Sequence, residues 1–289
     1  MVAVRGGGAL LGRPIGSGRM TATPSDAEPS TALFVLDGDQ AVPTERARGP
    51  WSPMALHGGP VAALVARGVE LHAGSDDLQL ARITLELIRP VPVAPLTVRS
   101  TVVRPGRKVQ LIDTVVEADG VEVAWSRALR IRVAAGPTLE PTVPEDDAPR
   151  PPELGYSSAS MVDSYRAFHN EGMEMRYVSG SFEQPGPATV WFRLRCPVVL
   201  GEVPTPWQRA AAASDFGNGV GAELPFGSSR FINPDLTISI HRPPVGEWVC
   251  LDARTRFGTP GIGAAESELW DVQGRIGRAV QSLLVEVEP

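Results

Sequence analysis

The sequence contains one strand-like pattern twice, as RITLELIRP at residues 82–90 and as DLTISIHRP at residues 235–243. Polar and apolar residues alternate in both stretches, and both end in Arg-Pro. Alternation with a period of two residues is typical of a strand that buries one face. The apolar positions align in order, Ile83, Leu85 and Leu87 with Leu236, Ile238 and Ile240. We therefore expect a duplicated unit with an equivalent strand in each half.

Further strand-like runs follow each copy of this pattern. The last two runs of each half are separated by a short glycine turn, Asp119-Gly120 in the first half and Gln273-Gly274 in the second. Turns of this type favour β-hairpins, so the strands are predicted to be antiparallel. The predicted strands cover residues 96–103, 109–117 and 121–133 in the first half, and residues 248–255, 263–271 and 275–287 in the second.

One helix is predicted ahead of each block of strands. In the first half, Pro60 suits the first turn, and apolar residues recur at helical spacing until Gly74 ends the pattern. In the second half, Thr205 is an N-cap residue and Pro206 suits the first helical position. Separate sheets of this size would leave open edges, so we expect the halves to pair into one wide sheet.

The chain has 289 residues, which is enough for two units of ordinary size. Residues 136–155 are rich in proline and acidic side chains and predict a linker. This linker separates a first unit at 31–135 from a second at 156–289. Residues 1–30 predict a disordered extension, whose glycines interrupt anything like a signal peptide; Met1 and Met20 are both candidate initiators.

Composition and charge exclude several classes of function. The formal net charge of −6 gives no general basic field for nucleic acid or an anionic membrane, and no apolar run is long enough to span a bilayer. Cys196 and Cys250 are too few for a disulfide scaffold and predict buried thiols in a cytoplasmic protein. The four histidines have no zinc-binding spacing, and no phosphate-binding glycine loop follows a strand. We expect no metal or cofactor.

Three segments carry a resemblance to a known family. They read PTERARGPWSPMALHGGPVAALVARGVE at residues 43–70, ATVWFRLRCPVVLGEVPTPWQRAAAASDFGNG at 188–219 and INPDLTISIHRPPVGEWVCLDARTRFG at 232–258. They resemble the acyl-CoA thioesterase-like family of double hot-dog proteins, which is related to thioesterase II. The resemblance covers about residues 31–135 and 156–289 and implies an α+β double hot-dog fold, in which each half wraps an antiparallel sheet around a helix.

The resemblance also implies a set of site residues. In thioesterase II enzymes an Asp on the second helix, a Ser or Thr at the start of the following strand and a Gln on the last strand hold the hydrolytic water. These positions fall on Asp215, Asn233 and Gln281. Asn233 departs from the pattern because an amide replaces the hydroxyl. An amide can also donate to a carboxylate or a water, so we expect all three residues to be catalytic.

The residues themselves give independent reasons for this assignment. Gln281 is a polar residue on the apolar face of the last strand, and a buried amide without a partner costs about 1 to 3 kcal/mol. Asp215 follows a helix face of small residues, and carboxylates are seldom buried without partners. Asn233 precedes Pro234, which holds it extended. The structural alternatives are a Gln bonded to backbone, an exposed acid at a helix end and an Asn in an ordinary turn.

The sequence His57-Gly58-Gly59-Pro60 lies at the predicted start of the first helix, where free backbone N–H groups can bind an oxyanion. We expect His57, Gly58 and Gly59, together with Gly217, to bind the substrate. In the repeat alignment Arg127 corresponds roughly to Gln281 and no acid corresponds to Asp215, which predicts a single catalytic centre. The tryptophans Trp51, Trp125 and Trp207 are expected in the core, and Arg230, Arg254 and Arg256 are candidates to meet the phosphates of CoA.

Hydrolysis of an acyl-CoA, or of another acyl thioester, is the function that these features favour, with a role in fatty acid metabolism. One alternative is a hot-dog hydratase or dehydratase, which needs a His/Asp pair that His57 could complete. The other is an acyl-binding protein without catalysis, which the amide at Asn233 favours. The length of the acyl group and the state of any homo-oligomer are left open by the sequence.

Overall fold

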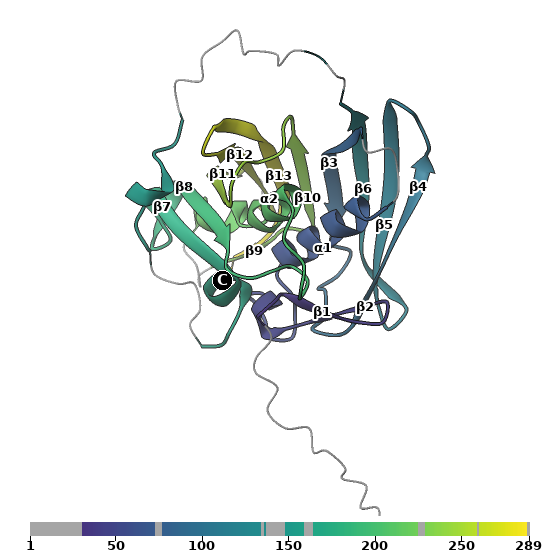
Figure 1. Cartoon of the computed structure of the whole chain (residues 1–289). Coiled ribbons are helices and arrows are strands. Elements are labelled where there is room, and N and C mark those ends of the chain that lie inside the picture. Colours follow the sequence, from purple (N-terminus) through teal and green to yellow (C-terminus); the bar gives the residue numbers. More distant parts are fainter. Residues whose placement is uncertain are drawn as a thin grey trace, which may run out of the picture.

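The computed structural model describes residues 31–72, 77–133, 136, 148–158, 164–224, 229–258 and 260–287. In this part of the chain thirteen strands form one sheet, whose strands pair antiparallel (Figure 1). The order along the sheet is β1-β2-β4-β5-β6-β3-β10-β13-β12-β11-β8-β7, and β9 pairs with β13. The predicted extension at 1–30 lies outside the described residues.

The strands of the first half are β1 (Phe34–Asp37), β2 (Gln40–Pro43), β3 (Leu78–Glu86), β4 (Leu96–Arg104), β5 (Val109–Ala118) and β6 (Val121–Arg132). Those of the second half are β7 (Met173–Ser181), β8 (Gln184–Leu194), β9 (Ser229–Ile232), β10 (Asp235–Ile240), β11 (Trp248–Phe257), β12 (Ile262–Asp271) and β13 (Gly274–Val287). The helices are α1 (Gly58–Glu70), α2 (Pro206–Ser214) and α3 (Gly217–Val220), with short helical turns η1 (Glu45–Ala47), η2 (Pro152–Leu154) and η3 (Phe168–Gly172).

Helices α1 and α2 pack against each other at the centre of the molecule, on the same side of the sheet (Figure 1). Local sequence explains where they begin. Thr205 caps α2 by accepting a hydrogen bond from the backbone N–H of Gln208 at 3.2 Å, and Pro206 is the first helical residue, as predicted. The alanines 210–213 are at most 1% exposed, so this small-residue face permits close packing. Helix α1 ends at Glu70, before the predicted end at Gly74.

The two halves join where β3 pairs with β10. Thr84 lies opposite Thr237, and their hydroxyl oxygens are 3.3 Å apart. Residues on either side of this pair match symmetrically, Ile83 with Ile238 and Leu85 with Leu236. An approximate two-fold axis therefore passes through the threonine pair and relates the repeats that the sequence predicted. The wide antiparallel sheet is the expected double hot-dog arrangement.

Two hairpins were not predicted. The β1–β2 hairpin precedes α1 and continues the sheet beyond β4, and the β7–β8 hairpin precedes α2 and continues it beyond β11. Strands β1 and β2 have four residues each, too few for a period-two pattern to stand out. Each half is thus a helix between an early hairpin and a later block of strands.

Both cysteines are buried and free, as predicted. Burial raises the pKa of the Cys196 thiol to about 11 and that of Cys250 well above its usual range. The predicted linker lies largely outside the described residues, but its end is docked, because the carbonyl of Arg150 accepts a hydrogen bond from the indole of Trp191 at 2.8 Å. Within the described residues no helix is long and apolar enough to cross a membrane.

Candidate active site

Asp215 lies at the C-cap of α2, where the chain turns into α3, and its side chain is 5% exposed. The aromatic rings of Phe216 and Phe168 pack against His57 and against each other in the core, with Phe216 at 1% exposure. A carboxylate in such surroundings requires hydrogen-bond partners to remain charged. The partners come from three different elements.

Both predicted amides contact Asp215. Its Oδ1 accepts a hydrogen bond from Nδ2 of Asn233 at 2.8 Å and a longer one from Nε2 of Gln281 at 3.3 Å. Gln281 is 1% exposed and its Nε2 also donates to the backbone carbonyl of Asp215 at 3.3 Å. The fold therefore brings together Asp215, Asn233 and Gln281, which lie directly after α2, before β10 and on β13.

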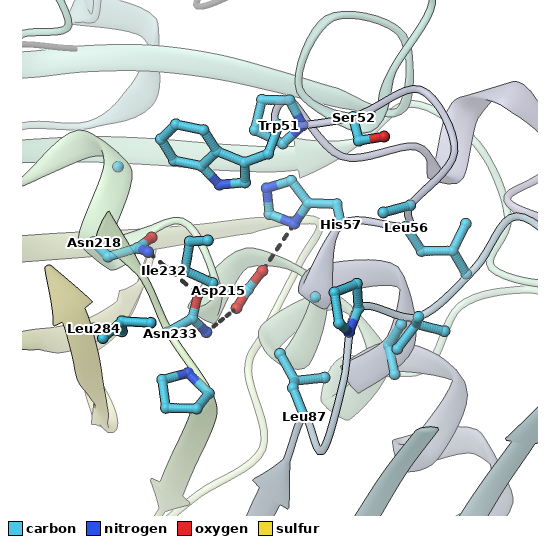
Figure 2. Close-up of a pocket in the computed structure, with 18 of the residues that line it drawn as sticks. Trp51, Ser52, Leu56, His57, Leu87, Asp215, Asn218, Ile232, Asn233 and Leu284 are labelled. Carbon is cyan, nitrogen blue, oxygen red and sulfur yellow. Dashed lines mark hydrogen bonds and ion pairs between the residues drawn. The ribbon is translucent and has the colours of Figure 1, made fainter. Parts of the chain in front are cut away.

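The second carboxylate oxygen faces His57, the N-cap residue of α1. Nδ1 of His57 lies 2.8 Å from Oδ2 of Asp215, and the backbone N–H of Gly59 is 3.0 Å from the same nitrogen. Nδ1 cannot donate to the first and accept from the second at once. The charge-assisted hydrogen bond to a carboxylate is the stronger, so we assign the proton of Nδ1 to the Asp215 contact. Nε2 then carries a free lone pair, and Figure 2 shows this nitrogen pointing away from Asp215, towards Trp51.

Glycines allow this close approach of α1 to the end of α2. A Cβ atom on Gly58 would lie 2.6 Å from Oδ2 of Asp215, and one on Gly59 would lie 2.5 Å from the carbonyl oxygen of Ala212. A Cβ on Gly217 would lie 2.6 Å from Oγ of Ser267. Gly58 lines the cavity described below, whereas Gly59 and Gly217 are not among its lining residues. Close packing accounts for those two glycines better than substrate contact does.

An open cavity of about 430 Å³ adjoins the carboxylate (Figure 2). Its walls are mainly apolar and come from the loop before α1, the start of α1, the segment after β3, the segment around β9 and strand β13. They include Leu56, Val61, Leu87, Val91, Phe231, Ile232 and Leu284. The polar groups that reach it include His57, Asp215, Asn218 and Asn233. The arrangement suits a ligand with an apolar chain and one reacting polar group.

Three expectations about other side chains need correction or refinement. Trp51 is not a core residue, because it is 42% exposed and lines the cavity, with its ring edge-on to Phe231 at 5.8 Å. Trp207 is buried as predicted, whereas Trp125 is only partly buried, with Cζ of Arg127 5.3 Å from the centroid of its ring. None of the arginines proposed for CoA lines the cavity, and Nη1 of Arg230 lies 3.7 Å from Oε2 of Glu286. The arginine that does line the cavity is Arg89, which the sequence did not single out.

The two-fold axis defines the corresponding position in the first half, and the repeat alignment was off by one residue. Thr84 pairs with Arg127 as Thr237 pairs with Val280, so Ala128, not Arg127, corresponds to Gln281. An acid is present near the end of α1, contrary to prediction. Glu70 accepts a 2.8 Å hydrogen bond from the hydroxyl of Thr205, the N-cap of α2. Burial raises the pKa of Glu70, and no imidazole faces it among the described contacts.

Two features of the site were beyond sequence reasoning. The first is the direct contact of His57 with Asp215: the sequence offered His57 for a His/Asp pair but did not identify Asp215 as its partner. The second is Asn218, which contacts both amides and lies in a Gly-Asn-Gly stretch without a recognisable motif. The repeat symmetry was the available signal for the first, because each helix start meets the end of the other helix.

Comparisons with known proteins agree with this architecture. The family model described as the acyl-CoA thioesterase N-terminal domain matches residues 47–132, and that of the C-terminal domain matches residues 140–285. A hot-dog protein of unknown function from Alicyclobacillus acidocaldarius is similar in structure, with a TM-score of 0.69 and 18% identity over 91% of this chain and 98% of that one. The acyl-CoA thioesterase II TesB2 of Mycobacterium marinum has a TM-score of 0.60 and 15% identity over 80% of this chain and 91% of its own. No curated protein matches the sequence.

Proposed function

The chain belongs to the acyl-CoA thioesterase family, and on this premise we propose that it hydrolyses an acyl-CoA to a free acid and CoA with a water bound at Asp215. The observation that carries the proposal is the buried carboxylate of Asp215 at the wall of an apolar cavity, with its two oxygens held by side chains from separate elements. Fixed partners of this kind orient a carboxylate before the substrate arrives.

The hydrogen bonds leave room for one more donor on Asp215. A carboxylate offers about four lone-pair positions. Oδ1 accepts from Asn233 and Gln281, whereas Oδ2 has His57 as its partner. We assign the remaining position on Oδ2 to the hydrolytic water. Asp215 orients this water and accepts its proton, while Asn233 and Gln281 fix the carboxylate.

His57 has a second function in this scheme. Its Nδ1 is tied to Asp215, so its Nε2 is presented to the cavity in a defined tautomer. From there Nε2 can accept the second proton of the attacking water, from the hydroxyl of the tetrahedral intermediate, and pass it to the leaving thiolate of CoA, so that the acyl product leaves as a carboxylate. The backbone N–H of Gly58, at the start of α1 and at the cavity wall, is assigned as a donor for the oxyanion that develops on the thioester carbonyl.

The apolar walls of the cavity are assigned to the acyl group. Leu87 and Val91 follow β3, and Phe231 and Ile232 belong to β9, so both halves contribute to the same wall. Burial of apolar surface contributes about 25 cal/mol per Å², so the binding free energy of an acyl chain increases with the length that these walls cover. The proposal includes a cytoplasmic setting and a role in fatty acid metabolism; the free, buried thiols Cys196 and Cys250 support the former.

A second candidate function follows from one specific contact. A hydratase or dehydratase of hot-dog fold would use a His/Asp pair, and the 2.8 Å contact of His57 with Asp215 is such a pair. This reaction adds or removes water at a carbon–carbon double bond and leaves the thioester intact.

One assay separates these reactions. The protein is incubated with saturated and 2,3-unsaturated acyl-CoAs, and free thiol and product masses are measured together. Thiol release from saturated substrates supports hydrolysis. A mass change of one water without thiol release from the unsaturated substrates would replace it with the second candidate. Saturable binding with neither change would indicate an acyl-binding protein.

A further inference from the structure

We propose that Asn218 is a positioning residue that sets the orientation of both amides around Asp215. The inference rests on the proposed function for its effect on catalysis, although the orientation itself can be measured without turnover. Asn218 belongs to α3, directly after the turn that carries Asp215, and its side chain is 8% exposed. It contacts Gln281 through its backbone and Asn233 through its side chain.

The backbone of Asn218 fixes Gln281. Its N–H donates to Oε1 of Gln281 at 3.0 Å, which turns Nε2 of the same amide towards Asp215. This contact requires α3 to lie close to β13. Gly217 permits that approach, because a Cβ atom there would lie 3.0 Å from Oε1 of Gln281 and closer still to Ser267.

The side chain of Asn218 fixes Asn233. Nδ2 of Asn218 donates to Oδ1 of Asn233 at 3.2 Å, so Nδ2 of Asn233 faces Oδ1 of Asp215 at 2.8 Å (Figure 2). Two acceptors hold this Nδ2, because it also donates to the backbone carbonyl of Asp235 at 3.2 Å. Asn218 therefore occupies the acceptor end of each amide, and Asp215 occupies the donor end.

The amide of Asn233 has to be held in one orientation, whereas a hydroxyl at this position would not. A primary amide has a donor end and an acceptor end of nearly the same shape, so a rotation by half a turn would direct the carbonyl oxygen at the carboxylate. A hydroxyl rotates its single proton to whichever acceptor is present. The Ser or Thr of the thioesterase II pattern needs no neighbour to orient it, whereas Asn233 does. We infer that Asn218 is the residue that makes an amide workable at position 233.

The test is a double-mutant cycle between positions 218 and 233. Asn218→Ala removes the donor to Asn233 and keeps the backbone contact to Gln281. In the natural background we expect kcat to fall about 10-fold with KM nearly unchanged, the size of one lost hydrogen bond. In the Asn233→Thr background the same substitution should cost less than about 2-fold, because a hydroxyl orients itself. Equal losses in the two backgrounds would show that Asn218 does not act through Asn233.

Asn218→Asp is a stronger variant of nearly unchanged size. A carboxylate at 218 accepts and cannot donate, so it should attract the NH₂ of Asn233 and turn its carbonyl towards Asp215. We expect a fall in kcat larger than that of Asn218→Ala, and unchanged kcat would overturn the proposal. Val280→Ala is the matched control, because Val280 is next to Gln281, 41% exposed on the outer face and outside the site.

A measurement without turnover separates this proposal from the proposed function. The side-chain NH₂ signals of Asn233 and Gln281 can be followed by ¹⁵N NMR in the wild type and in Asn218→Asp. The Asn233 signal should move strongly and the Gln281 signal little, since the backbone N–H of residue 218 is retained. If the wild type releases no thiol from any acyl-CoA but this shift is seen, the function is wrong and the positioning role holds. If the Asn233 signal does not move, the positioning role is wrong whatever the activity.

Discussion

Nδ1 of His57, at the start of α1, lies 2.8 Å from Oδ2 of Asp215, at the end of α2. Both side chains are buried, at 8% and 5% exposure, and both line the same cavity. The packing of the two helices thus places the imidazole of His57 against the carboxylate of Asp215, which two amides hold in place. Several properties of the protein follow from this geometry.

Replacing the carboxylate tests the proposed mechanism most directly. Asp215→Asn keeps the size of the side chain and removes its ability to accept a proton from water. We expect kcat to fall by about 10² to 10⁴-fold, the range for loss of a general base, while the affinity for a non-hydrolysable acyl-CoA analogue changes little. The rate of thiol release gives kcat, and titration calorimetry gives the affinity for the analogue. Normal turnover by this variant would show that another group activates the water.

His57 can be separated from Asp215 by a partial replacement. Asn at position 57 can keep a donor near Oδ2 of Asp215, but it lacks the second nitrogen that faces the cavity. His57→Asn should therefore lower kcat less than Asp215→Asn and leave the melting temperature near that of the wild type, whereas His57→Ala should lower both kcat and stability. A His57→Asn enzyme with unchanged kcat would exclude the imidazole from proton transfer.

Gly58 tests the close contact between the helices. A Cβ atom there would lie 2.6 Å from Oδ2 of Asp215 and 2.8 Å from its Cγ. Gly58→Ala should displace the carboxylate and lower the free energy of unfolding by about 1 to 3 kcal/mol. We expect kcat to fall by more than this loss of stability alone would cause. Gly68→Ala is the matched control in the same helix, where the added atom would meet the side chain of Ser100 at 3.0 Å. Similar loss of activity in both variants would indicate general destabilisation instead.

Glu70 should make stability depend on pH. Burial is the main cause of its raised pKa, so the folded protein binds the Glu70 proton more tightly than the unfolded chain. Stability from this group is therefore fully present below the ordinary pKa of 4.5 and is lost as the pH rises through the folded value. Glu70→Gln should raise the melting temperature relative to wild type near pH 7, with a difference that shrinks towards pH 4. A difference independent of pH would contradict this.

The two thiols should not react in the native protein. Burial raises the pKa of Cys196 to about 11, so very little thiolate exists near pH 8, and Cys250 is fully buried. We expect no reaction with an aromatic disulfide reagent under native conditions and reaction of both thiols after unfolding in guanidinium. Rapid labelling of the native chain would show that one of these sites opens. The same measurement provides the blank for the thiol-release assay.

The sequence by itself determined the duplicated architecture. Alternation at 82–90 and 235–243 predicted the strand in each half that forms the junction, and the glycine turns predicted the antiparallel pairing. The caps at Thr205 and Pro206 fixed where α2 begins. These features are local, because they depend on backbone geometry and on which face of an element is buried. The resemblance to a family added Asp215, Asn233 and Gln281 as one set, although their catalytic role stays a prediction.

Only the tertiary structure decided how those side chains meet. The contact of His57 with Asp215 depends on the packing of α1 against α2, and that of Asn218 with Asn233 depends on the position of α3 against β13. Such packing cannot be read from the sequence, because these side chains belong to no periodic pattern. Trp51 could not be told from a core tryptophan for the same reason. The correction from Arg127 to Ala128 required the strand register, in which a shift of one residue moves a side chain to the opposite face of the sheet.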